Sequence, residues 1–267
     1  MDFIPHLRRE CLAFETAARQ VAGDAPMISS CPDWSMANLV AHLGWVHRFV
    51  THIVVNRLRV RPDVADRSYL GLPAGAEGWP GRADERPYRG RIPAGMLDWF
   101  AEGAAALADA FASTDLATEV VTWSTEQTVG FWLRAQTIEA TVHRWDAQHA
   151  LGAAEAVDTE LALDAIDHDL TVVVGKRRSL GSASAGAGER YGFRQTDGDR
   201  AWVVEFDGED VRLHQHRGPE DLAADVELAG TASQLMLFCW RRITAEQLTV
   251  RGDRSLLARY ASLLPDV

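Results

Sequence analysis

The residues best able to do chemistry are a glutamate and a histidine four positions apart, Glu139 and His143. They lie in a segment with helical patterning, and residues i and i+4 of a helix stand one above the other on the same face. A carboxylate oxygen and an imidazole nitrogen presented together are ligands for a divalent cation. The spacing alone is a weak signal, because many helices carry it by chance.

A third ligand is available on an earlier helical segment, where His42 stands among apolar residues. Three protein ligands with an open position are typical of a catalytic metal site, whereas a structural site is closed. Plainer interpretations exist: His42 could be a core histidine bonded to a backbone carbonyl, and Glu139 could face solvent. A buried Glu139 would need a cation or a donor. His47 and His52 lie on other faces of the same segment, and we expect both to be solvated or peripheral.

Length and charge limit the class of protein. At 267 residues the chain is long for one domain, so two domains are expected. Hydrophobic residues make up 47% of it, and no apolar run reaches the length of about 18 residues that spans a bilayer. The net charge of -11 argues against nucleic acid as a partner, because binding phosphates requires a basic surface. We therefore expect no nucleic acid and no membrane as partners.

The cysteines, Cys11, Cys31 and Cys239, are too few and too far apart for a disulfide framework or a cysteine-rich zinc site. The first residues also lack the basic-then-apolar order of a signal peptide, so a reduced cytoplasm is the simplest expectation. Lys176 is the only lysine among 27 basic residues, a bias that indicates a GC-rich coding sequence and an actinobacterial type of host.

Helical periodicity dominates the chain up to about residue 182. The expected helices are 3–21, 35–58, 94–111, 126–151 and 159–178. Ser35 is expected to cap the second helix, Pro93 to lie in the first turn of the third, and Gly152 to end the fourth. The connection over 60–92 is rich in Pro, Gly, Arg and Asp, and a loop of this length often borders a functional cleft.

The spacing of apolar residues changes from the helical period of 3.6 to the strand period of 2 after residues 182–188. This segment consists of small residues and is typical of a linker. Strands are expected at 191–196, 201–206, 211–216, 226–229 and 248–251, with helices at 231–241 and 255–264. Asp-Gly pairs separate the first three strands, which is a strong hairpin signal. The second half is therefore expected to be a small α+β domain built on an antiparallel meander.

These patterns predict a multidomain α and α+β protein, with a helical bundle over 1–181 and a small antiparallel-sheet α+β domain over 189–267. His42 lies near the start of the second helix, while Glu139 and His143 lie midway along the fourth. Facing helices of a four-helix bundle can aim such side chains at a common point in the core. The bundle is therefore the element that must position the three ligands.

Two stretches around these residues resemble the signatures of a known family. Residues 31–43 read CPDWSMANLVAHL, similar to the CPGW-(T/S)-V-x-(D/N)-L-V-x-H-L motif of the mycothiol-dependent maleylpyruvate isomerase family. Residues 139–147 read EATVHRWDA and resemble its second motif, E-x-x-V-H-R-W-D-A. The resemblance continues at 227–235, 240–242 and 250–253, so it covers nearly the whole chain. Three motifs in the right order are specific for the family but not for a substrate.

The resemblance implies a DinB-like metal-binding four-helix bundle, whose ligands transfer onto His42, Glu139 and His143. The implied metal is zinc, although two nitrogens and one oxygen would also admit Ni²⁺, Co²⁺ or Fe²⁺.

Three further residues of the second motif have expected roles. Asp146, three residues after His143, is expected to orient a ligand or a water, or else to form a surface salt bridge with a neighbouring arginine. Arg144 and Trp145 are expected to be structural.

The resemblance also implies the chemistry. Mycothiol would bind through its sulfur at the open metal position and be held as the reactive thiolate. In isomerases of the family the thiolate adds to a cis double bond, the single bond rotates, and elimination gives the trans product. An arginine of the C-terminal domain would stabilise the developing enolate. Arg242 stands where the W-G-R element of relatives has this arginine, but Arg241 replaces the usual glycine. Either could face the cleft, or both could be surface charges.

The expected function is that of an enzyme in which a divalent metal activates mycothiol to attack a small electrophile, as a thiol S-transferase or a cis-trans isomerase. The alternatives are maleylpyruvate isomerase proper and a non-catalytic metal- or ligand-binding stress-response protein. An accessible fourth coordination position would favour an enzyme, and a metal buried without access would favour a binding protein. We expect a cytoplasmic monomer or homodimer whose partners are the thiol cofactor and a small-molecule electrophile.

Overall fold

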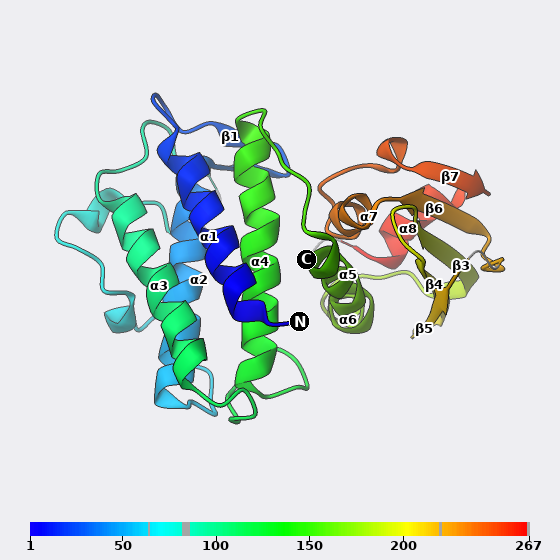
Figure 1. Ribbon diagram of the computed structural model, residues 1–267, viewed down its shortest axis with the longest axis horizontal. Coiled ribbons are helices and arrows are strands. Elements are labelled where there is room, and N and C mark those ends of the chain that lie inside the picture. The colour runs from blue at the N-terminus through cyan, green and yellow to red at the C-terminus, as the bar shows by residue number, and fades with distance from the viewer. Residues whose placement is uncertain (64, 82–85, 219–220, 266–267) are drawn as a thin grey trace. The chain divides into compact units, whose positions relative to one another are not determined.

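The computed structural model describes residues 1–63, 65–81, 86–218 and 221–265. The chain divides into two compact units, residues 1–155 and 156–267, each with its own elements (Figure 1). Within the described ranges, no helix is long and apolar enough to cross a membrane.

Four long helices and a short hairpin make up the described part of the first unit (Figure 1). Their bounds are α1 Phe3–Arg19, β1 Met27–Ile28, β2 Cys31–Ser35, α2 Met36–Asn56, α3 Met96–Ser113 and α4 Val129–Ala150. α1 and α2 each pack against both α3 and α4, so the four helices form the predicted bundle. The hairpin lies beside two of them, since β1 contacts α4 and β2 contacts α2.

The starts of α2 and α4 follow local capping chemistry. At the start of α2, the Asn38 side chain accepts a hydrogen bond from the backbone N–H of Ser35 at 3.0 Å. At the start of α4, Thr128 Oγ1 accepts a hydrogen bond from the backbone N–H of Phe131 at 3.1 Å. Because Thr128 is the cap, α4 begins three residues later than the periodicity predicts.

The third helix also begins later than predicted, at Met96. Gly95 precedes it with a φ of 76°, a left-handed conformation that glycine adopts without strain. Pro93 therefore lies in the turn before α3 and not in its first helical turn, which corrects the prediction. Gly152, just after α4, has a φ of 70° and ends that helix as expected.

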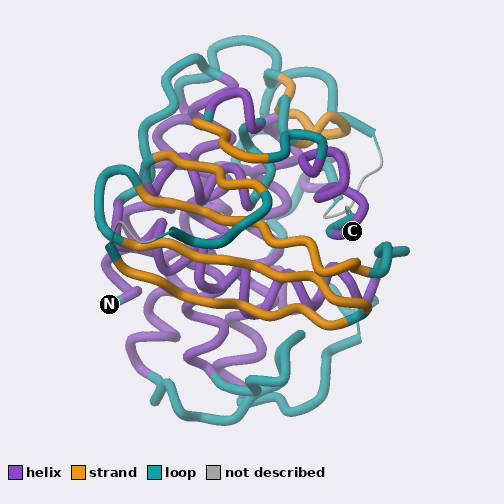
Figure 2. The backbone as a smooth tube through the Cα atoms, turned by 90° about the vertical axis from the view of Figure 1, so that its right-hand side faces the viewer, coloured by secondary structure: helices purple, strands orange, loops and turns teal. Residues whose placement is uncertain are grey.

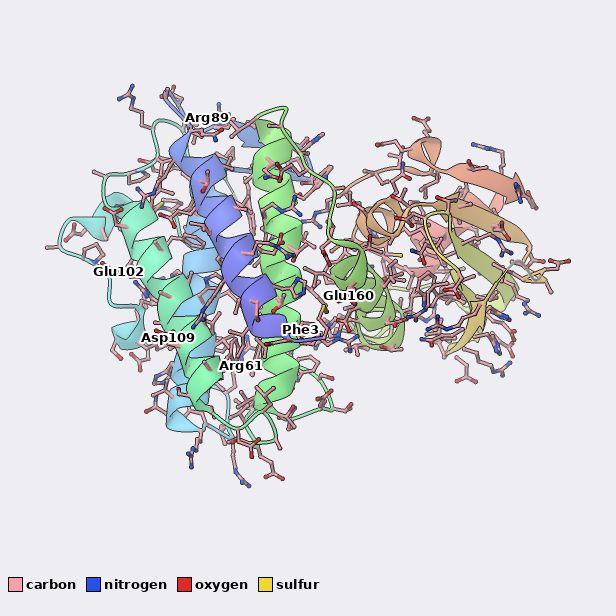
Figure 3. All side chains as sticks on the ribbon, viewed as in Figure 1. Phe3, Arg61, Arg89, Glu102, Asp109 and Glu160 are labelled. Atoms are coloured by element: carbon pink, nitrogen blue, oxygen red, sulfur yellow. The ribbon has the colours of Figure 1, made fainter. Side chains whose placement is uncertain are left out.

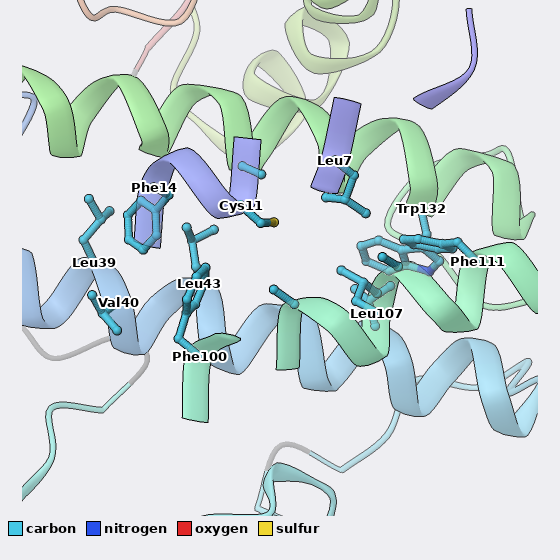
Figure 4. Close-up of a cluster of buried hydrophobic side chains, with 14 of the residues drawn as sticks. Leu7, Cys11, Phe14, Leu39, Val40, Leu43, Phe100, Leu107, Phe111 and Trp132 are labelled. Carbon is cyan, nitrogen blue, oxygen red and sulfur yellow. The ribbon is translucent and has the colours of Figure 1, made fainter. Parts of the chain in front are cut away.

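Apolar side chains from all four helices meet in the core of the bundle (Figure 4). Phe14 of α1 and Phe100 of α3 pack with ring centroids 4.9 Å apart. His47 is also fully buried here, its ring 5.5 Å from that of Phe100, so the expectation that it is solvated or peripheral is wrong. α3 packs on that face of α2, and burial lowers the pKa of His47 to about 3, which keeps the imidazole neutral.

The long connection between α2 and α3 contains two short 3-10 helices, Ser68–Leu70 and Ala76–Gly78. Hydrogen bonds fasten its described residues to the bundle. Trp99 Nε1–H of α3 donates to the Leu70 carbonyl at 2.9 Å, and the Tyr88 backbone N–H donates to Asn38 Oδ1 of α2 at 2.7 Å. The connection is therefore fastened to α2, which carries His42, and to α3.

The outer faces of the helices carry charged side chains, among them Glu102 and Asp109 of α3 (Figure 3). Asp109 pairs with Arg8 of α1 at 2.9 Å. Both side chains are more than half exposed, so the pair contributes little to stability. The bundle therefore depends on its apolar core and its buried polar contacts.

The second unit contains a five-stranded sheet with the strand order β5-β4-β3-β6-β7 (Figure 2). The bounds are β3 Gly186–Gln195, β4 Arg200–Gly208, β5 Asp210–Arg217, β6 Val226–Gly230 and β7 Thr249–Gly252. β3, β4 and β5 form the predicted antiparallel meander. β6 pairs in parallel with β3, so the sheet as a whole is mixed. This pairing joins segments far apart in the sequence, which local turn signals cannot reveal.

Helices complete the second unit. Their bounds are α5 Thr159–His168, α6 Val174–Leu180, α7 Ala232–Cys239 and α8 Leu256–Leu263. A π-helical turn, Asp169–Val173, joins α5 to α6 within the single helix predicted over 159–178.

α5 and α6 belong with the sheet and not with the bundle. α5 packs against α7, and the Val157 backbone N–H donates to Ser233 Oγ at 2.9 Å. Arg178 of α6 donates to the carbonyls of Leu263 and Gly208 at 2.9 and 3.0 Å. The compact unit therefore begins at residue 156, ahead of the segment 182–188 where the composition suggests a linker.

Candidate metal centre

The three predicted ligands converge at one point in the bundle. Glu139 Oε1 lies 2.9 Å from His42 Nε2 and 3.5 Å from His143 Nε2. One donor atom from each of the three residues lies within 4.8 Å of the others. Ligands about 2.1 Å from a tetrahedral Zn²⁺ are about 3.4 Å apart, so this spacing is close to what the ion requires.

Two helices and the hairpin create this arrangement. Glu139 and His143 stand on one face of α4 because they are four residues apart, and α2 packs against α4 with His42 turned to that face. The rings of His42 and His143 are 5.1 Å apart and nearly perpendicular. Trp34 of β2 lies against the His42 ring at 4.7 Å, so the hairpin covers the α2 side of the cluster.

A second set of contacts holds His143 in place. Its Nδ1 lies 2.9 Å from Asp146 Oδ2, and Ser30 Oγ donates to Asp146 Oδ1 at 2.6 Å. The Asp146 side chain is fully buried, so its carboxylate depends on these partners. A carboxylate on Nδ1 keeps the proton there and leaves Nε2 as the lone-pair nitrogen that faces the cluster. Of the two roles expected for Asp146, this geometry matches the orienting one.

The charges of the cluster favour an ionised carboxylate. Burial opposes ionisation of Glu139, but hydrogen bonds and positive charge from His143 and His42 hold its pKa well below the usual range. Burial also opposes charging of His143, but its bonds to Asp146 and Glu139 raise its pKa. Both shifts arise because negative oxygens surround the histidine nitrogens. A divalent cation would satisfy the same oxygens and nitrogens in place of protons.

The cluster is reachable from one side. The side chains of His42 and Glu139 are 15% and 30% exposed, whereas that of His143 is 7% exposed. Access is therefore greatest at the carboxylate. The donor set, its spacing, the carboxylate behind His143 and this accessible side together fit a divalent cation with an open coordination position.

Other residues of the second motif hold the bundle together. Arg144 Nε donates to Glu10 Oε2 of α1 at 2.9 Å, and both side chains are about 5% exposed. Its Nη1 also donates to Gln148 Oε1 at 2.8 Å. Trp145 stacks on His149 with ring centroids 4.5 Å apart. Arg144 therefore ties α1 to α4 and does not enter the ligand cluster.

Arg241 and Arg242 lie in the second unit, directly after α7 and the Trp240 that ends it. Arg241 has a φ of 61°, in the left-handed region that favours glycine, the usual residue of the family pattern at this position. Its guanidinium donates to the Leu264 carbonyl, and Arg242 Nη1 donates to the Trp240 carbonyl at 2.8 Å. Both side chains are half-buried, and a catalytic role for either stays a prediction.

Sequence patterns do not reveal Ser30. It lies in the turn between β1 and β2. β1 has two residues, which is too short for an alternation of apolar and polar residues to be recognised. The contact also spans 116 residues, from Ser30 to Asp146. Nothing in the local sequence signals such a partner.

A helical bundle that holds two histidines and a glutamate, followed by a unit with a mixed sheet, defines a class of candidate metal-dependent proteins. The family model for the mycothiol maleylpyruvate isomerase N-terminal domain matches residues 6–148. The model for the C-terminal domain of the same family matches residues 160–259. The chain therefore belongs to the mycothiol maleylpyruvate isomerase family.

Solved structures show the same fold. Two are described as crystal structures of the mycothiol-dependent maleylpyruvate isomerase, one of them a histidine-to-alanine mutant. Each is 14% identical, covers 94% of this chain and 93% of its own, and superimposes with a TM-score of 0.59. A search of curated proteins gives no significant match. The two structures thus support the fold, and the activity of this chain has to be argued from its site.

Proposed function

We propose that this chain is a metal- and mycothiol-dependent enzyme that joins a low-molecular-weight thiol to a small electrophile, as a thiol S-transferase or a cis-trans isomerase. The observation that carries the proposal is the cluster of His42, Glu139 and His143, which presents three donors and is accessible on the Glu139 side. Family membership supports mycothiol as the thiol.

His42, Glu139 and His143 would hold the metal, for which zinc fits two nitrogens and one oxygen. A bound divalent cation would lower the pKa of a thiol at the open position and so supply a thiolate at neutral pH. His42 and His143 each present Nε2, and the ionised Glu139 provides the only negative charge among the three ligands.

The surrounding residues orient these ligands. Asp146 accepts the Nδ1 proton of His143 and fixes the direction of Nε2, while Ser30 holds the other oxygen of the Asp146 carboxylate. Trp34 packs on the His42 ring and excludes water from that side. Together they keep the donor atoms pointed at one position before any ligand arrives.

For the substrate we propose Arg242 as the group that meets a carboxylate or a developing enolate. Arg241 is the second candidate. Both guanidinium groups donate to carbonyls of their own unit, and Arg242 is preferred because it stands at the position of the arginine in the W-G-R element of the family pattern. The partners are then a thiol cofactor and a small electrophile, in a cytoplasmic protein that acts as a monomer or homodimer.

The test combines metal analysis with a turnover screen. Wild type, His143→Ala and His149→Ala are assayed for bound zinc and for turnover of an electrophile panel, with and without mycothiol. His149 is the matched control, because it is exposed on the same helix. We expect His143→Ala to lose metal and turnover, and His149→Ala to keep both. Full metal content in His143→Ala would refute the ligand assignment, and equal turnover without mycothiol would refute the cofactor.

Maleylpyruvate isomerase proper is the second candidate, favoured by the family models that match both units. Including maleylpyruvate in the panel distinguishes maleylpyruvate isomerase from a thiol S-transferase. Turnover of maleylpyruvate alone would support the isomerase, and turnover of epoxides or haloalkanes would support an S-transferase. Metal binding without any turnover would support a non-catalytic binding protein.

A further inference from the structure

A separate cavity of about 450 Å³ lies in the first unit, between two helices and the long connection. Its walls come from α2, α3 and the residues between them. They are Ala41, Trp45, Arg67, Leu72, Trp79 and Trp99, together with Glu77 and small or proline residues of the connection. The volume falls within the range of about 300–1,000 Å³ that is usual for pockets that bind small molecules.

This cavity is not the metal centre. None of the three ligands lines it, and its α2 wall consists of Ala41 and Trp45, which share one helical face. His42 follows Ala41 by one residue, so its side chain leaves the helix about 100° further round. The two sites therefore use different faces of α2.

The aromatic walls are held rigidly. Trp99 bonds the Leu70 carbonyl through its indole N–H, and its ring lies so close to Gly44 that a Cβ there would collide with it. Trp79 meets Trp99 edge-on with centroids 5.7 Å apart. Because these rings are already fixed, a ligand would find formed apolar surfaces and would not have to order them.

Among the described residues that line the cavity, Arg67 and Glu77 carry charges and the others are uncharged. Both are exposed. The guanidinium carbon of Arg67 lies 5.9 Å from the ring centroid of Trp45. Across the described part of the chain, neither charged side chain makes an ion pair or a hydrogen bond with another residue. Among the described residues, the pocket thus offers a cation and an anion that form no ion pair with another side chain.

We propose that this pocket binds a small zwitterion with a large apolar side group, the class to which free amino acids such as phenylalanine belong. Arg67 pairs with the carboxylate, for which a guanidinium has matching geometry. Glu77 pairs with the ammonium, and the indoles of Trp45 and Trp79 cover the apolar group. A ligand that lacks one of the two charges loses one of these two charge-assisted pairings, which weakens its binding.

The test is calorimetric titration of the full chain with three probes. L-phenylalanine carries both charges, L-phenylalaninamide lacks the carboxylate, and N-acetyl-L-phenylalanine lacks the ammonium. We expect L-phenylalanine to bind about tenfold more tightly than either analogue, since a hydrogen-bonded charge contributes about this factor.

Two variants assign the charges. Arg67→Gln should weaken L-phenylalanine about tenfold and leave the amide unchanged, whereas Glu77→Gln should weaken L-phenylalanine and leave the N-acetyl probe unchanged. Arg61→Gln is the matched control, because Arg61 is an exposed arginine of the same connection that does not line the cavity (Figure 3).

Three outcomes would overturn the proposal. The first is that L-phenylalanine at millimolar concentration gives no heat of binding to wild type beyond that of buffer. All three probes could bind equally, which would mean a purely apolar pocket. A neutral disaccharide could bind where L-phenylalanine does not, which would mean that the indoles recognise a sugar ring.

Discussion

Replacing Asp146 by asparagine removes one charge behind His143, the proposed metal ligand, and changes almost nothing else. The carboxylate accepts the Nδ1 proton of His143 at 2.9 Å and the Ser30 hydroxyl proton at 2.6 Å. Asparagine has the same shape, and its amide oxygen can still face His143 while its amide nitrogen faces Ser30 Oγ. The substitution therefore weakens the contact without opening a cavity.

The expected magnitude follows from the loss of charge. A hydrogen bond to a charged acceptor is worth about 1.5–3 kcal/mol, and one to a neutral acceptor about 0.5–1.5 kcal/mol. The midpoints of these ranges differ by about 1.25 kcal/mol, close to the 1.4 kcal/mol that is a factor of ten in an equilibrium constant. We therefore expect Asp146→Asn to weaken zinc binding about tenfold. Asp146→Ala, which leaves the Nδ1 proton without an acceptor, should weaken it up to about a hundredfold.

The assay is competition for zinc against a chelator, with the free energy of unfolding of each metal-free variant measured in urea. Asp109→Asn is the matched control, because Asp109 is an exposed carboxylate of the same bundle. Ser30→Ala should fall between the control and Asp146→Asn, since Ser30 acts only through Asp146. If Asp146→Asn binds zinc as tightly as wild type, Asp146 does not position His143 and the reasoning fails.

Three further predictions concern stability, each measured by urea unfolding. Arg144→Met removes the buried arginine partner of Glu10 and leaves it the half-exposed Arg9, whose Nε lies 3.1 Å from Glu10 Oε1. The substitution should cost about 1.5–3 kcal/mol, and a loss under 1 kcal/mol would contradict a buried ion pair. The unfolded chain binds a proton at His47 below pH 6.5 and the folded chain only near pH 3, so stability should fall by about 1.4 kcal/mol per unit as the pH drops between these values. His47→Leu should remove this part of the slope, and an unchanged slope would refute it. Gly44→Ala pushes a Cβ into the indole of Trp99 on α3 and should lower the free energy of unfolding by about 1–3 kcal/mol. Gly175→Ala is the control, because the space around Gly175 is open, and it should stabilise α6 slightly.

Most elements of the fold could be predicted from the sequence because their signals are local. Apolar spacing predicts the four long helices of the bundle, and Asp-Gly pairs predict the hairpins between β3, β4 and β5. The parallel pairing of β6 with β3 has no local signal, since it depends on a crossover between distant segments. The same is true of the packing of α5 on α7, which brings the helix after Gly152 into the sheet-bearing unit.

The candidate site divides in the same way. The i, i+4 spacing of Glu139 and His143 puts both on one helical face whatever the rest of the chain does. Sequence alone could not decide between His42 and His47, two of the three histidines of α2. His42 stands among apolar residues and yet meets Glu139, while His47 was expected at the surface and lies in the core. Helical periodicity defines faces relative to one another, but only packing decides which face meets which neighbour.

Residue types and their order along the chain thus determined the helices, the candidate ligand pair on α4 and the family to which the chain belongs. Tertiary structure decided what stands behind the ligands and what borders them. Ser30 reaches Asp146 from a turn 116 residues away, and Trp34 covers His42 only because a two-residue strand pairs with its neighbour. Such contacts depend on side-chain packing across elements, which no local pattern encodes.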